Sequence, residues 1–241
     1  MQLNNMDYIN YVKQSPMSMG GLGGPVGALN FHHAASGGGN TGFYGARGLF
    51  ATGYDQAGNE SNVIDYVNIS TTGNFTDFGD LQWGRRAGGC CTGDSGSRMC
   101  IGGGYSNVGT EGSSMQDVIG YIATASTGNA SNFGNLTVKR YAVSACSSSD
   151  RGVWCFGQQS GSPAYTNIMD YVTINSTGNA TDFGDTQYSA RSVFAMSNGV
   201  RGICGGGTPE NNNINYFAID TTGNASDFGD MIEQQNGYQA A

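Results

Sequence analysis

The stretch Thr177-Gly178-Asn179-Ala180-Thr181-Asp182-Phe183-Gly184-Asp185 decides how this chain must be read, because near-copies of it occur four times. The other copies occupy residues 72–80, 127–135 and 222–230. Their glycines, at positions 73, 128, 178 and 223, are 55, 50 and 45 residues apart. Copies at an interval of about fifty residues indicate one small structural unit repeated along the chain.

Two further landmarks keep the same order in each unit. An arginine precedes a short apolar run, and a tyrosine opens a β-type run. The arginines are Arg47, Arg98, Arg151 and Arg201, and the tyrosines are Tyr66, Tyr121, Tyr171 and Tyr216, with a fifth at Tyr8. The pattern therefore predicts four short strands in each unit, separated by turn-forming residues. In the third unit the predicted strands cover 139–144, 152–157, 170–174 and 180–183.

The composition is typical of an all-β protein. The 241 residues include 41 glycines, and only 12% are charged, against about 25% in ordinary domains. No segment keeps a helical apolar period, whereas strand-sized runs bounded by turn residues recur throughout. The 38% of hydrophobic residues stand in register across the units, which favours a packed core over a disordered low-complexity chain.

The order of these strands resembles a kelch repeat over about residues 25–230. Its parts are an arginine-led strand, an apolar strand running into a glycine doublet, a tyrosine-led strand and an aromatic-bearing strand. The doublets Gly102-Gly103 and Gly205-Gly206 match well, whereas Gly157-Gln158 keeps only half. Phenylalanine stands where kelch repeats carry tryptophan, at Phe78, Phe133, Phe183 and Phe228, and these are expected core anchors. The resemblance implies a β-propeller of four-stranded blades around a central channel.

Unit counting predicts one domain over 1–241. The full repeats cover about 25–81, 82–136, 137–185 and 186–230, and the terminal fragments are 1–24 and 231–241. Residues 7–12 echo the tyrosine-led strand, but Pro16, Met17 and Met19 stand where Thr-Gly-Asn is expected. We expect about five blades, with the terminal blade incomplete or shared between the two termini. A truncated chain and completion by a neighbouring subunit are alternatives.

All length variation between units falls in one kind of loop, which links the second strand to the third. These loops cover 54–62, 105–116, 158–167 and 208–213. In a propeller they emerge on one face, and such a face commonly binds partners, although drift in unconstrained loops gives the same pattern. The candidate contact residues are Tyr54, Tyr105, Tyr165 and Asn211, with the tyrosines as stacking surfaces.

Catalytic chemistry has little support in the sequence. His32 and His33 are adjacent, so on a strand they point to opposite faces and cannot share a metal, which removes the two-histidine copper site of kelch-like oxidases. Six cysteines show no CxxC spacing and are expected as buried thiols, with Cys146–Cys155 or Cys91–Cys100 bridges as alternatives. No nucleophile elbow, phosphate-binding loop or zinc signature occurs, so we expect no enzyme, cofactor or metal.

The recurring charged and amide residues are predicted to be structural. One arginine ladder is the set before the apolar runs, and a second is Arg86, Arg140 and Arg191. Asp80, Asp185 and Asp230 recur near the second ladder, so pairing between blades is favoured over ligand binding. The sequons at Asn74, Asn129, Asn179 and Asn224 are interpreted as hairpin turns and not as glycan acceptors.

The amino-acid sequence of the repeats is similar to that of repeat proteins of tailed-phage virions, especially those of marine phages. This resemblance implies a non-enzymatic virion structural protein: an appendage such as a tail fibre, a capsid decoration or a host-attachment component. Its partners would be other virion proteins, copies of itself, and a host surface glycan or receptor, with assembly in the host cytoplasm and contacts at the terminal fragments and the variable loops. The net charge of −8 disfavours nucleic acid, and no stretch is apolar enough for membrane insertion. The alternative is a soluble carbohydrate- or protein-binding propeller of cellular origin.

Overall fold

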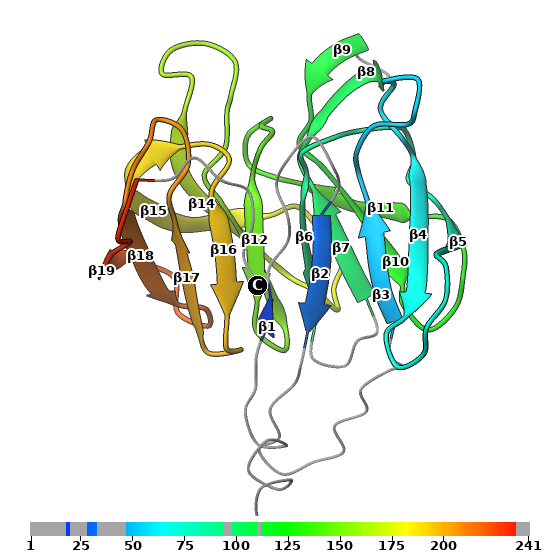
Figure 1. The fold of residues 1–241 in the computed structure, drawn as a ribbon. Helices are drawn as coiled ribbons and strands as arrows, with labels where there is room; N and C mark the ends of the chain where they lie inside the picture. The colour runs from blue at the N-terminus through cyan, green and yellow to red at the C-terminus, as the bar shows by residue number, and fades with distance from the viewer. Residues whose placement is uncertain (1–17, 20–27, 33–46, 94–97, 110–111, 235–241) are drawn as a thin grey trace, which may run out of the picture.

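The computed structural model describes residues 18–19, 28–32, 47–93, 98–109 and 112–234. Within these ranges every regular element is a β-strand and the sheets are antiparallel, so the protein is all-β (Figure 1). The expected class is therefore confirmed at this level.

The strands form four meanders of four, each ordered along the chain. The first is β2 (Ala28–His32), β3 (Arg47–Ala51), β4 (Val63–Asn68) and β5 (Thr76–Asp80). The second is β6 (Gly89–Thr92), β7 (Arg98–Gly102), β10 (Val118–Ala123) and β11 (Ser131–Asn135). The third is β12 (Ser144–Ser147), β13 (Arg151–Cys155), β14 (Thr166–Thr173) and β15 (Thr181–Ala190). The fourth is β16 (Phe194–Ser197), β17 (Arg201–Gly205), β18 (Asn213–Ala218) and β19 (Ser226–Asp230).

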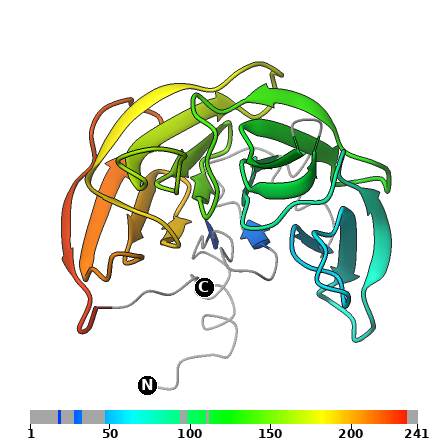
Figure 2. The same ribbon diagram turned by 90° about the horizontal axis from the view of Figure 1, so that it is seen from above.

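The four meanders stand side by side in an arc (Figure 2). Their first strands contact one another on the inside of the arc, in the order β2, β6, β12 and β16. The short strand β1 (Ser18–Met19) pairs with both β16 and β2, through Ser18 opposite Ser197 and opposite His32. It thereby connects the fourth meander to the first. The hairpin β8 (Tyr105–Gly109) and β9 (Gly112–Met115) is an insertion in the second meander.

The first strand of the third unit lies later in the chain than the sequence predicted. Residues 139–144 were expected, but β12 is Ser144–Ser147. Two features explain the difference: Ala142 has a φ of 53°, which no extended strand tolerates, and Arg140 is fully buried and turns inward. The other strands overlap their predicted ranges, but β14 begins at Thr166, before the expected 170, and β15 continues to Ala190, beyond the expected 183. Strand β13 ends at Cys155 because Phe156 has a φ of 61°.

The repeated phrase joins each meander to the one before it. Gly128 N donates to the carbonyl of Phe78 at 2.7 Å, and Ala130 N donates to the carbonyl of Asp80 at 2.7 Å. The Asn129 side-chain oxygen accepts from Asp80 N at 3.0 Å. The next two junctions repeat these bonds, through Gly178, Asn179 and Ala180 to β11, and through Gly223, Asn224 and Ala225 to β15. The expected turns are therefore also the contact between units.

The arginine before each apolar run also joins neighbouring meanders. Arg47 donates to the carbonyl of Thr124 at 2.8 Å, and its guanidinium lies 4.9 Å from the centre of the Tyr66 ring. Arg98 and Arg151 repeat both contacts, with the carbonyls of Ile174 and Ile219 and the rings of Tyr121 and Tyr171. Pairing between units is confirmed for these three, but the partner is a backbone carbonyl and not a carboxylate.

The second arginine ladder was assigned in the wrong register. Arg140 corresponds to Arg85, because each donates to one carbonyl of the second strand and one of the third strand in its own meander. Arg85 donates to the carbonyls of Ile101 and Val118. Arg140 donates to those of Trp154 and Ile168. Arg86 and Arg191 instead form bridges with the residues after the second strand, as Tyr141 does. Adjacent arginines at 85 and 86 left the sequence spacing ambiguous.

Three of the four predicted phenylalanine anchors are buried. Phe78, Phe133 and Phe183 are 2%, 3% and 2% exposed, and each meets the tyrosine of its own meander edge to face at 5.9 to 6.0 Å. Phe228 is 51% exposed, so the prediction of a fourth anchor is wrong for the described residues. The physical reason is that among these residues no further meander follows β19 to cover it.

All six cysteines are buried, and none of them forms a disulfide bond. Cys91 lies opposite Cys100, as the sequence suggested, but Cys146 lies opposite Val153, so the predicted facing of Cys146 and Cys155 is wrong. Burial raises the pKa of Cys90 and Cys100 to about 12, and of Cys91 and Cys146 well above the usual value. These four thiols therefore stay protonated near neutral pH and react slowly.

Replacing Phe183 with alanine tests the core. We expect Phe183→Ala to lower the free energy of unfolding by about 3–5 kcal/mol, because it leaves a cavity between two meanders. Phe75→Ala is the matched control, since Phe75 is 52% exposed, and should cost less than about 1 kcal/mol. Urea denaturation measures both, and a loss below about 1 kcal/mol for Phe183→Ala would contradict the packing described above.

Thiol reactivity tests the burial of the cysteines. At pH 8 the native chain should react with a thiol reagent about a hundredfold more slowly than the urea-unfolded chain, which should expose all six thiols. In the unfolded chain the thiols ionise near their ordinary pKa of 9.0, whereas in the folded chain burial raises the pKa of Cys90 and Cys100 to about 12. Between these two pH values the unfolded chain loses protons that the folded chain keeps, so the free energy of unfolding should fall as the pH rises from about 9 to about 12. Rapid labelling of any thiol in the native chain would show local exposure.

Candidate functional site

One face of the array carries a row of aromatic and guanidinium side chains at the loops that vary in length. We call the residues Tyr54, Arg86, Tyr105, Tyr141, Tyr165 and Arg191 the Arg–Tyr row. Isolated backbone bridges position it, because Arg86 pairs with Tyr105 and Tyr141 pairs with Gln158. Each bridge ties the chain entering a meander to the residue that follows its second strand. The row therefore stands on the meanders themselves and not on the loop tips.

Arg86 joins the first three meanders of the row. Its guanidinium carbon lies 4.5 Å from the centre of the Tyr105 ring, 5.4 Å from Tyr54 and 5.8 Å from Tyr141. Its Nε lies 3.4 Å from Oε1 of Glu60, which also accepts from Asn107 Nδ2 at 2.7 Å. The charge of Arg86 is thus balanced by a buried carboxylate, and the arginine is held for stacking.

Arg191 continues the row toward the fourth meander. Its Nη1 donates to the Tyr141 hydroxyl at 2.6 Å and also to Gln158 Oε1, while Tyr141 donates to the same Gln158 oxygen at 2.8 Å. The guanidinium lies 5.7 Å from the Tyr165 ring. Among the described residues no carboxylate lies within 4 Å of Arg191. Among the residues described, its charge is therefore compensated by tyrosine rings and the Gln158 amide.

Three of the four residues predicted from sequence come together in this row. Tyr54 is 40% exposed, and Tyr105 and Tyr165 are half-buried against the arginines. Asn211 is not brought into the row: its side-chain oxygen accepts from Asn213 N at 2.7 Å and closes its own loop. Tyr141 was not predicted as a member, although Arg86, Tyr141 and Arg191 each stand six residues after the end of a repeated phrase.

The row is suited to non-covalent recognition. Tyrosine rings offer stacking faces, and guanidinium and amide groups offer hydrogen-bond donors and acceptors. Within the described part of the chain no group of three or more His, Cys, Asp or Glu side chains could hold a metal ion. No helix in the same part of the chain is long and apolar enough to cross a membrane. His32 and His33 lie outside the described side chains.

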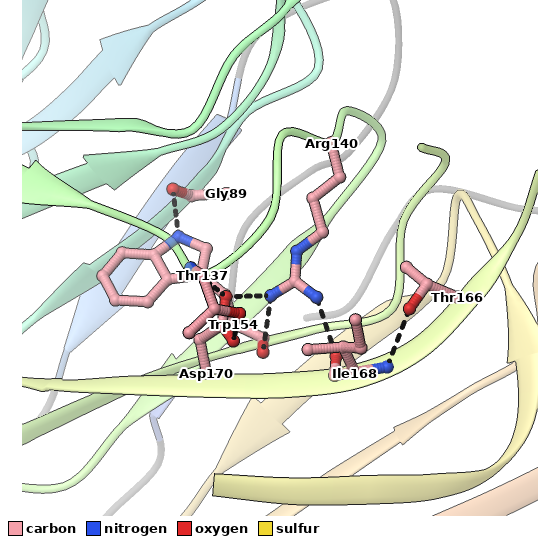
Figure 3. Close-up of polar contacts among 7 residues, drawn as sticks. All are labelled: Gly89, Thr137, Arg140, Trp154, Thr166, Ile168 and Asp170. Atoms are coloured by element: carbon pink, nitrogen blue, oxygen red, sulfur yellow. Dashed lines mark hydrogen bonds and ion pairs between the residues drawn. The ribbon is translucent and has the colours of Figure 1, made fainter. Parts of the chain in front are cut away.

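A buried ion pair lies in the third meander, and such pairs are candidates for catalytic groups. Arg140 Nη2 and Asp170 Oδ2 are 2.7 Å apart, and both side chains are fully buried (Figure 3). Thr137 donates its hydroxyl to Asp170 Oδ1 at 2.5 Å, and Arg140 Nη1 donates to the carbonyl of Ile168 at 3.0 Å. Burial lowers the pKa of Arg140, and the neighbouring Asp170 opposes this shift.

Comparison between repeats indicates a structural role for the buried arginine. Arg85 makes the corresponding bonds in the second meander, to the carbonyls of Ile101 at 3.1 Å and Val118 at 2.8 Å, and burial lowers its pKa to about 10. Gly120 stands in the place of Asp170, so the carboxylate is absent there. A buried arginine that binds two strands in both units acts as a cross-brace, and no substrate can reach it from the surface.

Removing one partner of the buried pair should be costly. Arg140→Met leaves the Asp170 carboxylate buried without its counter-ion, and we expect a loss of about 3–5 kcal/mol in the free energy of unfolding. The double variant Arg140→Met/Asp170→Leu should recover about half of that loss or more, because no buried charge remains. Chemical denaturation measures both variants. Equal losses in the single and double variants would show that the carboxylate is not the source of the cost.

Comparison with known proteins bears on the fold. No protein-family model matches the chain. No curated protein matches it either. Solved structures do match, and one of them, described as "Structure of YjhT", superposes with a TM-score of 0.62 at 8% sequence identity, covering 80% of this chain and 64% of that chain. This chain thus spans 64% of the length of that structure, and at such low identity the likeness shows a shared all-β fold and no function.

Proposed function

We propose that this chain is a kelch-like β-propeller of about five blades that serves as a non-enzymatic structural component of a tailed-phage virion. The observation that carries the proposal is the repeated junction, in which the same three hydrogen bonds join all three pairs of neighbouring meanders. The residues that recur in every unit hold neighbouring meanders together, which fits a structural role for the protein. The phage-like wording of those same repeats supports the virion as the setting.

The component is an appendage, a capsid decoration or a host-attachment part. Its partners are other virion proteins or further copies of the chain, and it is assembled in the host cytoplasm and resides in the particle. For an attachment role, the Arg–Tyr row provides the contact surface for a host glycan or receptor, because it combines stacking rings with hydrogen-bonding groups. The function requires no cofactor.

Proteomics of purified particles tests the virion assignment. The chain should be present in particles from the encoding phage at a fixed copy number, and native mass measurement of the isolated chain should show assembly. A chain absent from particles and freely monomeric in solution would contradict the proposal. Neighbouring genes for capsid and tail proteins would support it.

A soluble carbohydrate- or protein-binding propeller of cellular origin is the second candidate. The specific observation in its favour is Tyr54, whose ring is 40% exposed beside Arg86 at the end of the row. Tyrosines and arginines are enriched in binding hot spots, and exposed rings stack on the apolar faces of sugars. Particle proteomics separates the two candidates, because only the first requires the chain in virions.

Substitutions in the row test binding under either candidate. Against a glycan array, Tyr54→Ala and Tyr165→Ala should weaken binding about tenfold each, because each removes one stacking ring. Asn211→Ala is the matched control, since Asn211 lies on a variable loop outside the row and should leave affinity unchanged. Equal effects of all three variants, or none, would remove the row from the binding surface.

A further inference from the structure

The two arginines of the Arg–Tyr row stand in corresponding places but differ in the group that lies beside them. Glu60 and Tyr165 occupy the same position in their meanders, because each forms a backbone bridge with the third residue after the second strand. Glu60 stands 26 residues before Arg86, and Tyr165 stands 26 residues before Arg191. Arg86 therefore has a carboxylate oxygen 3.4 Å from its Nε, where Arg191 has a tyrosine ring 5.7 Å from its guanidinium carbon.

The uncharged position between the two arginines supports this comparison. Tyr141 stands there, and the residue 26 positions before it is Met115, which pairs with Tyr105. A neutral tyrosine needs no counter-ion, and the position beside it carries no charge. The carboxylate thus accompanies the arginine in the first of these places, is not needed in the second, and is lacking in the third.

Arg191 has hydrogen-bond donors that the described part of the chain does not use. Its Nη1 donates to the Tyr141 hydroxyl and to Gln158 Oε1. Its Nε is buried without a partner, and its Nη2 makes no hydrogen bond among the described residues. The side chain is half-buried, so water and salt screen its charge less than they screen a fully exposed arginine.

We propose that Arg191 binds the carboxylate of an Asp or Glu side chain from a partner protein, which takes the place that Glu60 takes beside Arg86. A guanidinium offers a planar fork of N–H groups that matches a carboxylate. Glu60 shows within the same chain that a glutamate side chain fits beside an arginine held by tyrosine rings. This observation favours a protein carboxylate over an acidic glycan. The inference rests on the proposed role of the row as a contact surface, and it does not need the virion setting.

NMR of the arginine side chains in the full chain tests the proposal. The probe is the peptide acetyl-Gly-Glu-Gly-amide, titrated at low ionic strength into protein that carries isotope-labelled arginine. The Nε signal of Arg191 should shift until it saturates, whereas that of Arg86 should not, because Glu60 already lies beside it. The peptide acetyl-Gly-Gln-Gly-amide is the matched control, since it has the same size without the charge, and it should shift neither signal.

Substitution of the arginine separates a local site from a general effect of charge. Arg191→Gln should weaken binding of the Glu peptide about tenfold or more, followed through the backbone amide signals around Gln158. Arg201→Gln is the matched control, because it removes the same charge from the start of β17, at the end of that strand away from the row. It should leave the affinity unchanged, and unchanged signals of β13 show that each variant is folded.

Two further substitutions test the comparison between the arginines. Tyr165→Glu places a carboxylate at the position that Glu60 holds, so it should fill the site and lower the affinity about tenfold below that of Tyr165→Gln, which removes the same ring without adding charge. Glu60→Gln removes the internal carboxylate, so the signal of Arg86 should then respond to the Glu peptide.

The proposal is overturned if the Glu and Gln peptides act alike on the unmodified chain, a comparison that requires no variant. Equal affinities of Arg191→Gln and Arg201→Gln, or of the two Tyr165 variants, would also overturn it. Glucuronate is the second probe, and tighter binding of glucuronate than of the Glu peptide would assign the site to an acidic glycan instead. Peptide binding by a chain that is absent from purified particles would uphold this inference and remove the virion setting, so the two can fail separately.

Discussion

The close approach of two backbones at each junction is the constraint on which the rest of the structure depends. Gly79 has a φ of 143°, and a Cβ placed there would lie 2.5 Å from the carbonyl oxygen of Gly128. Such a contact leaves no room for a side chain, so glycine is required in the fourth strand for the next turn to reach it. The repeated phrase therefore contains both a strand with a position that must lack a side chain and the turn that packs against that position in the preceding meander. Its repetition sets the spacing of the meanders and, through them, the position of the Arg–Tyr row.

Arginine stabilises this protein mainly by binding backbone carbonyls. Arg47, Arg98 and Arg151 donate to a neighbouring meander, and Arg85 and Arg140 donate within one. A planar guanidinium can satisfy several carbonyls at once, which a lysine ammonium cannot match in geometry. A chain with only 12% charged residues thus buries two of its ten basic side chains, Arg85 and Arg140, completely. Burial carries a desolvation cost, visible in the lowered pKa of Arg85 and Arg140, and multiple hydrogen bonds offset it.

Sequence patterns predicted the number of strands in each unit, three buried phenylalanines and the gathering of Tyr54, Tyr105 and Tyr165. These features could be predicted because residues at equivalent positions of a repeat occupy equivalent places in the fold, and the repeat spacing can be read directly from the sequence. The start of β12 and the partner of Arg47 were not predictable in the same way. The first depends on a buried side chain, Arg140, pulling the chain out of an extended path, and the second on a carbonyl, which no residue type reveals. Phe228 shows a further limit: a nearly identical phrase has a different environment at the end of an array, where none of the described residues covers it.

Variation between the units of one chain separates structural positions from those available for recognition. The glycines and phenylalanines of the phrase are the same in all four units, since each faces another unit or would face one. The position shared by Arg86, Tyr141 and Arg191 changes identity, yet the backbone bridge at each is retained. A position whose backbone role is fixed while its side chain differs can be altered without loss of the fold. In the Arg–Tyr row, Arg86, Tyr141 and Arg191 are side chains of this kind on a repeated backbone. The array can therefore present different side-chain chemistry at each meander.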